Sequence, residues 1–185
     1  MRLVQFVPAL ALTAVVMLGV CASSAAGAPA GTAAGDRPFG AVNLVDYTDN
    51  DGAASTVILT GGIGDFGAAV SVDANGAVNP DHNSGLELVL SQGSFRLDVA
   101  ELDRGVAAMM STFPPDRTTC SGTVSATAPA PIVAGTGTGA YRGIRGTFTL
   151  TVTIAEVDAK ANCAPGSAFL DQVIVTAGSG TVSPG

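Results

Sequence analysis

The residues that could carry chemistry in this chain are few and scattered. His82 is the one histidine among 185 residues, and it stands in the segment Asn-Pro-Asp-His-Asn that starts at Asn79. A Ser-His-Asp hydrolase would need His82 as its base, but the chain has no Gly-x-Ser-x-Gly nucleophile turn. A zinc site needs several His or Cys ligands, so one histidine is too few. We therefore interpret His82 as a surface-loop residue and predict no bound metal.

Arg96 and Asp98 alternate with Phe95, Leu97 and Val99, so the two charged side chains share one face of an expected strand. Inside a barrel such a pair could orient a ligand or act as acid and base. They are therefore our candidates for catalytic residues. The alternative is a solvated outer face, where charged side chains usually lie, and we favour that alternative.

An oxygen-rich segment contains Asp46, Asp49, Asn50 and Asp51. Calcium accepts such ligands, but the spacing is not that of an EF-hand loop. Asp and Asn are also common in ordinary turns, because their side chains hydrogen-bond the nearby backbone. We interpret the segment as a turn.

Residues 62–67 read Gly-Ile-Gly-Asp-Phe-Gly and match the dinucleotide-binding string. That chemistry needs the loop to open a helix whose N-terminus meets a pyrophosphate. The residues that follow, Ala68 to Asp73, are typical of a strand instead. We therefore predict that these glycines form a bend or a bulge, and we predict no cofactor.

The first residues have the order of a secretory signal. Arg2 precedes an almost wholly apolar run from Leu3 to Val20, and small residues follow it. We predict that residues 1–28 are a signal peptide, cleaved after Ala26 or Ala28, and that the mature chain is secreted or in the cell envelope. An uncleaved membrane anchor and lipid attachment at Cys21 are the alternatives. After cleavage we expect no membrane association.

Signal cleavage changes both the charge and the cysteine count. The formal net charge moves from -7 to -8 because Arg2 leaves. The remaining cations are not clustered, and nucleic-acid binding needs a basic patch, so we expect no nucleic-acid partner. Of three cysteines, Cys120 and Cys163 remain. An even pair in an exported chain predicts a disulfide, with two buried thiols as the alternative.

Residues 29–38 lack apolar periodicity and predict a flexible leader, so residues 39–185 form the domain. The clearest strand is Gly146 to Val157, where four apolar residues alternate with four threonines and so lie on one face. Further strands are expected at Ala41–Tyr47, Ser55–Thr60, Ala68–Asp73, Leu86–Leu90, Phe95–Val99, Cys120–Thr127 and Leu170–Ala177. Ala100–Met110 predicts a turn or short helix. Eight short strands joined by turns favour an all-β barrel or sandwich.

The segment from Val133 to Leu150 resembles the Gly-Thr-Gly-x-Tyr/Phe-x-Gly-x-x-Gly turn of the dirigent and allene oxide cyclase-like barrel superfamily. The resemblance covers about 18 residues. It implies a single antiparallel eight-stranded, calycin-like barrel in which this turn precedes a long late strand. We expect Tyr141 to plug the end of the barrel. The residues that match the turn are Gly137, Gly139, Tyr141, Gly143 and Gly146.

Plant members of that superfamily cyclise an epoxide or steer radical coupling, often as trimers or dimers. No position here matches the plant catalytic residues, so none is carried over. We expect an exported, non-catalytic barrel that binds a small apolar ligand or a cell-envelope component. One alternative is a cyclase or isomerase acting in the barrel cavity. Another is an immunoglobulin-like sandwich for interactions, against which the absence of Trp argues. Assembly into a homo-oligomer stays open.

Overall fold

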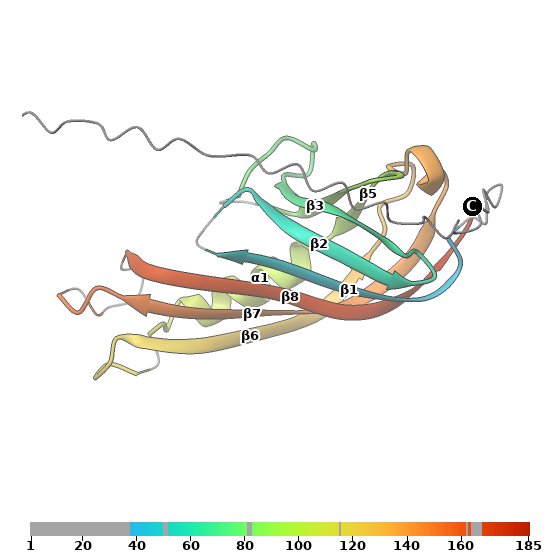
Figure 1. The fold of residues 1–185 in the computed structure, drawn as a ribbon. Helices are drawn as coiled ribbons and strands as arrows, with labels where there is room; N and C mark the ends of the chain where they lie inside the picture. The colour runs from blue at the N-terminus through green and yellow to red at the C-terminus, as the bar shows by residue number, and fades with distance from the viewer. Residues whose placement is uncertain (1–37, 50–51, 81–82, 115, 162, 164–167) are drawn as a thin grey trace, which may run out of the picture. The chain divides into compact units, whose positions relative to one another are not determined.

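A computed structural model describes residues 38–49, 52–80, 83–114, 116–161, 163 and 168–185 (Figure 1). The predicted signal peptide and nearly all of the predicted leader lie outside these residues. Eight strands form one sheet in the order β5-β4-β3-β2-β1-β8-β7-β6, with every neighbouring pair antiparallel. The strands are β1 (Gly40–Asp49), β2 (Ala54–Gly61), β3 (Asp65–Val72), β4 (Gly85–Leu90), β5 (Gly93–Asp98), β6 (Ser121–Pro131), β7 (Arg145–Asp158) and β8 (Phe169–Ser183).

All eight expected strands are confirmed, and the segment expected as a turn or short helix is α1 (Ala100–Met110). The two-residue periodicity of β7 has the predicted consequence. Phe148 and Leu150 are fully buried on the concave face, whereas Thr147 and Thr149 are exposed on the convex face. Burial of such side chains stabilises the sheet and fixes its register, because a slip by one residue would bury the hydroxyl groups instead.

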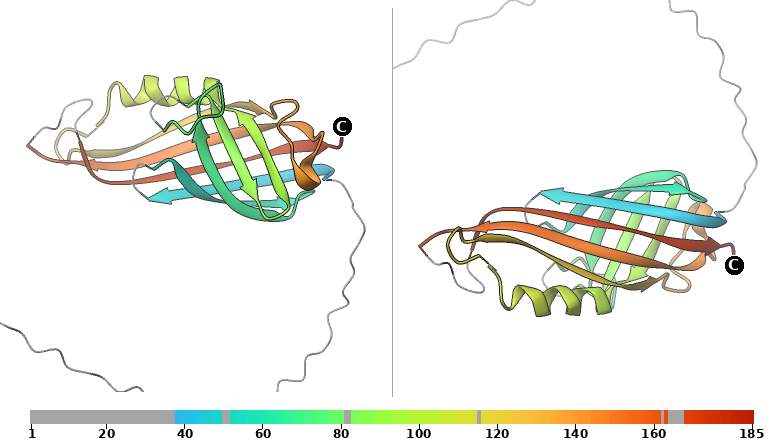
Figure 2. Two further views of the ribbon diagram at one scale, coloured as in Figure 1. Left: turned by 90° about the horizontal axis from the view of Figure 1, so that it is seen from above. Right: turned by 90° about the horizontal axis from the view of Figure 1, so that it is seen from below.

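The sheet curls into a half-barrel, so the prediction of a closed barrel is wrong (Figures 1 and 2). In the described residues, the edge strands β5 and β6 meet at one bridge, between Leu97 and Ile132. Strands β6, β7 and β8 have 11, 14 and 15 residues, whereas β4 and β5 have six each. The far part of β6 therefore has no strand opposite it, and α1 packs beside it. Because all strands share one sheet, the two-sheet sandwich is also wrong.

The half-barrel has two different ends. At the closed end lie the turns β2–β3 and β4–β5 and the 3-10 turn η1 (Gly139–Tyr141). At the open end lie the start of α1, the start of β6 and the last residues of β1 and β7. The predicted disulfide between Cys120 and Cys163 is confirmed, with 5.3 Å between its Cα atoms. It joins the start of β6 to the β7–β8 connection at the open end.

Candidate functional site

The open end contains a cavity of about 280 Å³ between the concave face of the sheet and α1. Its two walls differ in chemistry. The apolar wall comes mainly from β4, α1 and β7 and includes Leu86, Leu102, Val106, Met110, Val152 and Ile154. The polar wall comes from β1, β2, β3 and β8 and includes Asp46, Ser55, Ser71, Gln172 and Thr176. A cavity that combines apolar side chains with convergent polar groups is a usual form of a small-molecule site.

Asp46 is the most unusual group in this cavity. It follows Val42 and Leu44 on the concave face of β1 and is only 6% exposed. Its Oδ1 atom is buried and has no hydrogen-bond partner among the residues that the structure describes. Burial raises the pKa of Asp46 above its ordinary value of 3.8, and hydrogen bonds from Ser55 and the Tyr47 backbone only partly oppose this. A buried carboxylate with a raised pKa and a free acceptor is unusual in a purely structural position.

Further polar groups line the concave face beyond Asp46. Gln172 and Glu156 face each other across β8 and β7, and the Gln172 amide donates a hydrogen bond to Glu156. Asp158 is 2% exposed, and its backbone N–H donates to the Cys120 carbonyl at 2.8 Å. The polar wall thus continues from the cavity toward the disulfide.

The closed end buries a second aspartate in the opposite situation. Asp65 is 4% exposed, and Ser91 and Tyr141 hydroxyls each donate to its carboxylate at 2.5 Å. The backbone N–H groups of Phe66 and Gln92 donate at 2.8 and 3.1 Å. Burial alone would raise the pKa of Asp65, but these four hydrogen bonds together lower it. The Tyr141 pKa is raised, first by burial and then by its bond to Asp65.

Tyr141 lies buried at the closed end, and its ring meets that of Phe95 edge to face, with centroids 5.2 Å apart. The surrounding glycines allow this close approach. Gly139 has φ +55°, and a Cβ there would stand 2.2 Å from the Gln92 carbonyl oxygen. A Cβ at Gly137 would stand 2.0 Å from the Tyr141 carbonyl oxygen. The turn that carries the family resemblance therefore packs against β5 as a unit with Tyr141.

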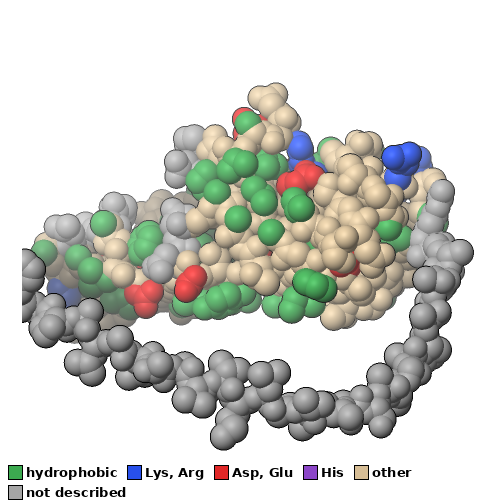
Figure 3. Space-filling model, turned by 45° about the horizontal axis from the view of Figure 1, so that its top comes forward, with side chains coloured by type: hydrophobic (Ala, Val, Ile, Leu, Met, Phe, Trp, Pro, Cys, Tyr) green, Lys and Arg blue, Asp and Glu red, His purple; other side chains and the backbone are tan. Residues whose placement is uncertain are grey.

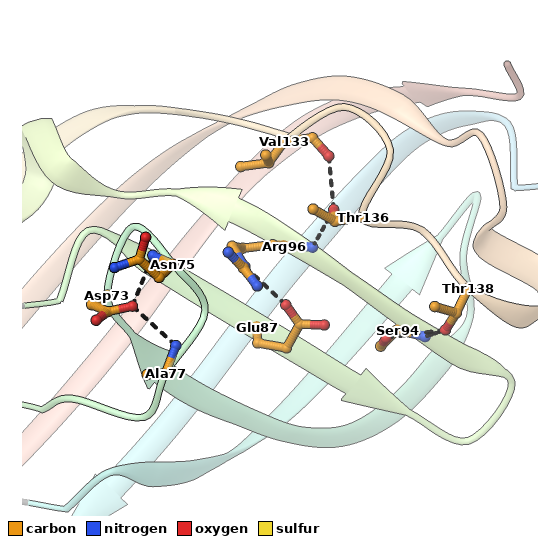
Figure 4. A network of polar contacts seen from close by, with 9 residues as sticks. All are labelled: Asp73, Asn75, Ala77, Glu87, Ser94, Arg96, Val133, Thr136 and Thr138. Carbon is orange, nitrogen blue, oxygen red and sulfur yellow. Dashed lines mark hydrogen bonds and ion pairs between the residues drawn. The ribbon is translucent and has the colours of Figure 1, made fainter.

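The same turn covers the edge of β5, as Figure 4 shows. The Ser94 N–H donates to Thr138 Oγ1 at 2.9 Å, and the Arg96 N–H donates to Thr136 Oγ1 at 3.0 Å. The Val133 N–H in turn donates to the Arg96 carbonyl at 2.8 Å. Threonine hydroxyls thus accept bonds that a neighbouring strand would otherwise accept, which shields an exposed edge.

Neither catalytic candidate lines the cavity. Arg96 projects from the convex face of β5, and its Nε atom pairs with Glu87 of β4 at 3.1 Å (Figure 4). Its guanidinium lies against Gly76 in the β3–β4 connection. Asp98 is exposed and accepts a hydrogen bond from the Ala100 N–H at the start of α1. Both residues therefore have local structural partners away from the cavity.

The other sequence candidates have ordinary positions or lie outside the described residues. Gly62 and Gly64 lie in the β2–β3 turn, as predicted, whereas Gly67 lies within β3. His82, Asn50 and Asp51 lie outside the described residues. Asp46 belongs to a strand rather than to the expected turn, and Asp49 ends that strand. Among described residues, no group of three or more His, Cys, Asp or Glu side chains could hold a metal ion.

The convex face of the sheet carries exposed apolar side chains. Val45 pairs with Ile58 across β1 and β2, and Ile58 pairs with Phe66 across β2 and β3. These three side chains are 51%, 53% and 66% exposed. Figure 3 shows hydrophobic side chains at the surface with few charged ones between them.

No family model, curated protein or solved structure matches this chain. In the part of the chain that the structure describes, no helix is both long and apolar enough to cross a membrane. Sequence reasoning considered Asp46 only as a calcium ligand and missed the cavity. The signal was present, because Val42, Leu44 and Asp46 are spaced by two and must share a face.

Proposed function

We propose that this protein binds a small molecule with an apolar body and one polar end in the cavity at its open end. The observation that carries the proposal is the buried Asp46 carboxylate, whose Oδ1 atom has no partner and which shares the cavity with an apolar wall. A cavity of about 150 Å³ holds benzene, so about 280 Å³ suits a ligand of roughly ten non-hydrogen atoms.

The contrast between the two ends supports binding over a purely structural role. At the closed end, Tyr141, Phe95 and the glycine-rich turn fill the interior. The Asp65 carboxylate there accepts four hydrogen bonds. A buried polar atom without a partner destabilises a fold by about 1–3 kcal/mol. A ligand that donates a hydrogen bond to Asp46 would remove this cost in stability, so the missing partner favours a binding role.

Export and kinship are parts of the same proposal. The pattern of residues 1–28 and the disulfide support an extracytoplasmic location, because disulfides persist mainly in oxidising compartments. The Val133–Leu150 turn, together with eight antiparallel strands in one sheet, supports kinship with the dirigent and allene oxide cyclase-like superfamily. The ligand class follows from the cavity and not from that kinship.

The test is whether filling the cavity abolishes binding. Native mass spectrometry of the protein from its own host, and NMR titration of Ile154 and Val152 methyl groups with apolar fragments, would detect a ligand. Val106→Trp would fill the cavity and is expected to abolish binding. Ile58→Trp adds the same ring on the convex face, where Ile58 is 53% exposed, and should leave binding intact. Equal loss in both variants, or no perturbation by any fragment, would overturn the proposal.

A second candidate, a cyclase or isomerase, is favoured by the position of Asp46, a buried carboxyl group that lines the cavity beside an apolar wall. A carboxyl group placed in this way can act as a general acid toward an epoxide or alkene, and burial raises the pKa of Asp46 in the direction that favours such a role. Limonene oxide is a suitable probe because its size is close to that of the cavity. Conversion by the native protein and not by Asp46→Asn would support the enzyme, whereas binding without conversion would leave the non-catalytic role.

A further inference from the structure

The charge of the cavity restricts the ligand further. Its described lining includes two carboxylates, Asp46 on β1 and Asp103 on α1, and no Lys, Arg or His. The whole chain is acidic, with a formal net charge of -7. A concave site lined by one sign of charge attracts ligands of the opposite sign and repels the same sign. An anionic ligand such as a fatty acid is therefore disfavoured at this site.

The Asp46 carboxylate receives fewer hydrogen bonds than its two oxygen atoms can accept. Ser55 and the Tyr47 backbone supply hydrogen bonds to Asp46, yet Oδ1 keeps no partner. Thr176, which lies directly across from Asp46 on β8, is 6% exposed and also lines the cavity. An ammonium group has three donors and one positive charge, so it could meet both Oδ1 and the neighbouring hydroxyl oxygens. A hydrogen bond between charged partners is about twice as strong as one between neutral partners.

We propose that the ligand is a primary amine on an apolar body of roughly ten non-hydrogen atoms, bound as its ammonium ion to Asp46. The inference rests on the proposed function, because it assumes that the cavity binds a ligand. The apolar body would lie against Leu102, Val106 and Ile154, and the ammonium group would lie against the polar wall. Burial of both Asp46 and its partner charge is then compensated by their direct contact.

The experiment compares three probes of one length that differ only at the head group: n-octylamine, n-octanol and octanoate. Isothermal titration calorimetry at pH 7 measures each against the native protein, Asp46→Asn and Asp98→Asn. Asp98→Asn removes the same charge from the convex face, outside the cavity. We expect octylamine to bind about tenfold or more tighter than octanol, and octanoate to bind weakest. Asp46→Asn should remove the preference for octylamine, and Asp98→Asn should keep it.

The outcomes separate this inference from the proposed function. If octanol binds as tightly as octylamine, or if Asp46→Asn and Asp98→Asn weaken octylamine equally, the ammonium assignment is wrong while the cavity remains a binding site. If none of the three probes binds the native protein, the proposed function itself fails. Circular dichroism of each variant checks that the strand content is retained, so that a loss of affinity is not a loss of fold.

Discussion

Asp65 at the closed end and Asp46 at the open end of the half-barrel are both buried, but their surroundings have opposite effects on them. Asp65 at the closed end and Asp46 at the open end are 4% and 6% exposed, so burial does not distinguish them. Asp65 accepts four hydrogen bonds, and its pKa is lowered. Asp46 keeps one oxygen without a partner, and its pKa is raised. The number of hydrogen-bond donors, and not the depth of burial, therefore decides whether the pKa of a buried carboxylate in this fold is lowered or raised.

The largest loss of stability is expected from a substitution at Tyr141, at the closed end. Tyr141→Ala removes the ring that fills the closed end and should lower the free energy of unfolding by about 3–5 kcal/mol. Tyr141→Phe keeps the ring, removes only the bond to Asp65, and should lower it by about 1–2 kcal/mol. Urea denaturation measures both. Tyr47→Ala is the control, because Tyr47 is 50% exposed on the convex face. Equal effects of Tyr47→Ala and Tyr141→Ala would show that the closed end is not a packed core.

At the open end, the disulfide between Cys120 and Cys163 is expected to stabilise the fold. Cys120→Ser combined with Cys163→Ser opens a loop of 43 residues and should lower the free energy of unfolding by about 4 kcal/mol at most. Hydrogen exchange should then quicken at the start of β6 and at the β7–β8 connection before it quickens near Asp65. Urea denaturation with and without reductant gives the total effect. Identical midpoints in the two conditions would contradict a stabilising disulfide.

The turn at the closed end offers a matched pair of glycines. Gly139 and Gly135 both have positive φ, but only Gly139 approaches another backbone, the Gln92 carbonyl. Gly139→Ala should therefore destabilise by about 3 kcal/mol, against about 1 kcal/mol for Gly135→Ala, which meets no atom within 4 Å. Thermal unfolding monitored by circular dichroism ranks the two. A larger loss at Gly135 would mean that the turn does not pack on β5.

The two aspartates themselves should respond to pH with opposite sign. The folded-state pKa of Asp65 is lowered, so its ionised form stabilises the fold at neutral pH, and this contribution is lost as the pH falls through that pKa. Asp65→Asn should therefore destabilise at pH 7 by about 1–3 kcal/mol, and the difference from the native protein should shrink in acid.

The folded-state pKa of Asp46 is raised above 3.8, so the native protein loses stability as the pH rises from about 4 through that pKa. Asp46→Asn should stabilise the ligand-free protein at pH 7 and lose this advantage at pH 3. Unfolding free energies of the native protein and both variants across pH 3 to 8 test the pair. Curves that move in the same direction would remove the distinction between the two ends.

The comparison also shows which features local patterns could predict. The alternation in β7 predicted its strand and its buried face correctly, because side-chain direction in a strand depends only on sequence spacing. Tyr141, which was expected to plug the end of a barrel, is buried at the closed end of the half-barrel, and its bond to Asp65, 76 residues away, had no local signal. The charges of Arg96 and Asp98 are visible in the sequence, whereas the burial of Asp46 and its place in the cavity depend on residues from several strands and α1.

The eight strands, their buried faces, a turn or short helix at α1 and a disulfide between Cys120 and Cys163 could all be predicted from the sequence. These depend on spacing along the chain and on the chemistry of each residue type. Other features follow only from the tertiary structure: β5 and β6 are joined at no more than one bridge, Thr136 and Thr138 cover the edge of β5, and Asp46 Oδ1 has no partner among the described residues. Each of these features depends on segments that are far apart in the sequence. The lengths of several strands and the curvature of the sheet set the distances between those segments in space. No single segment encodes these properties.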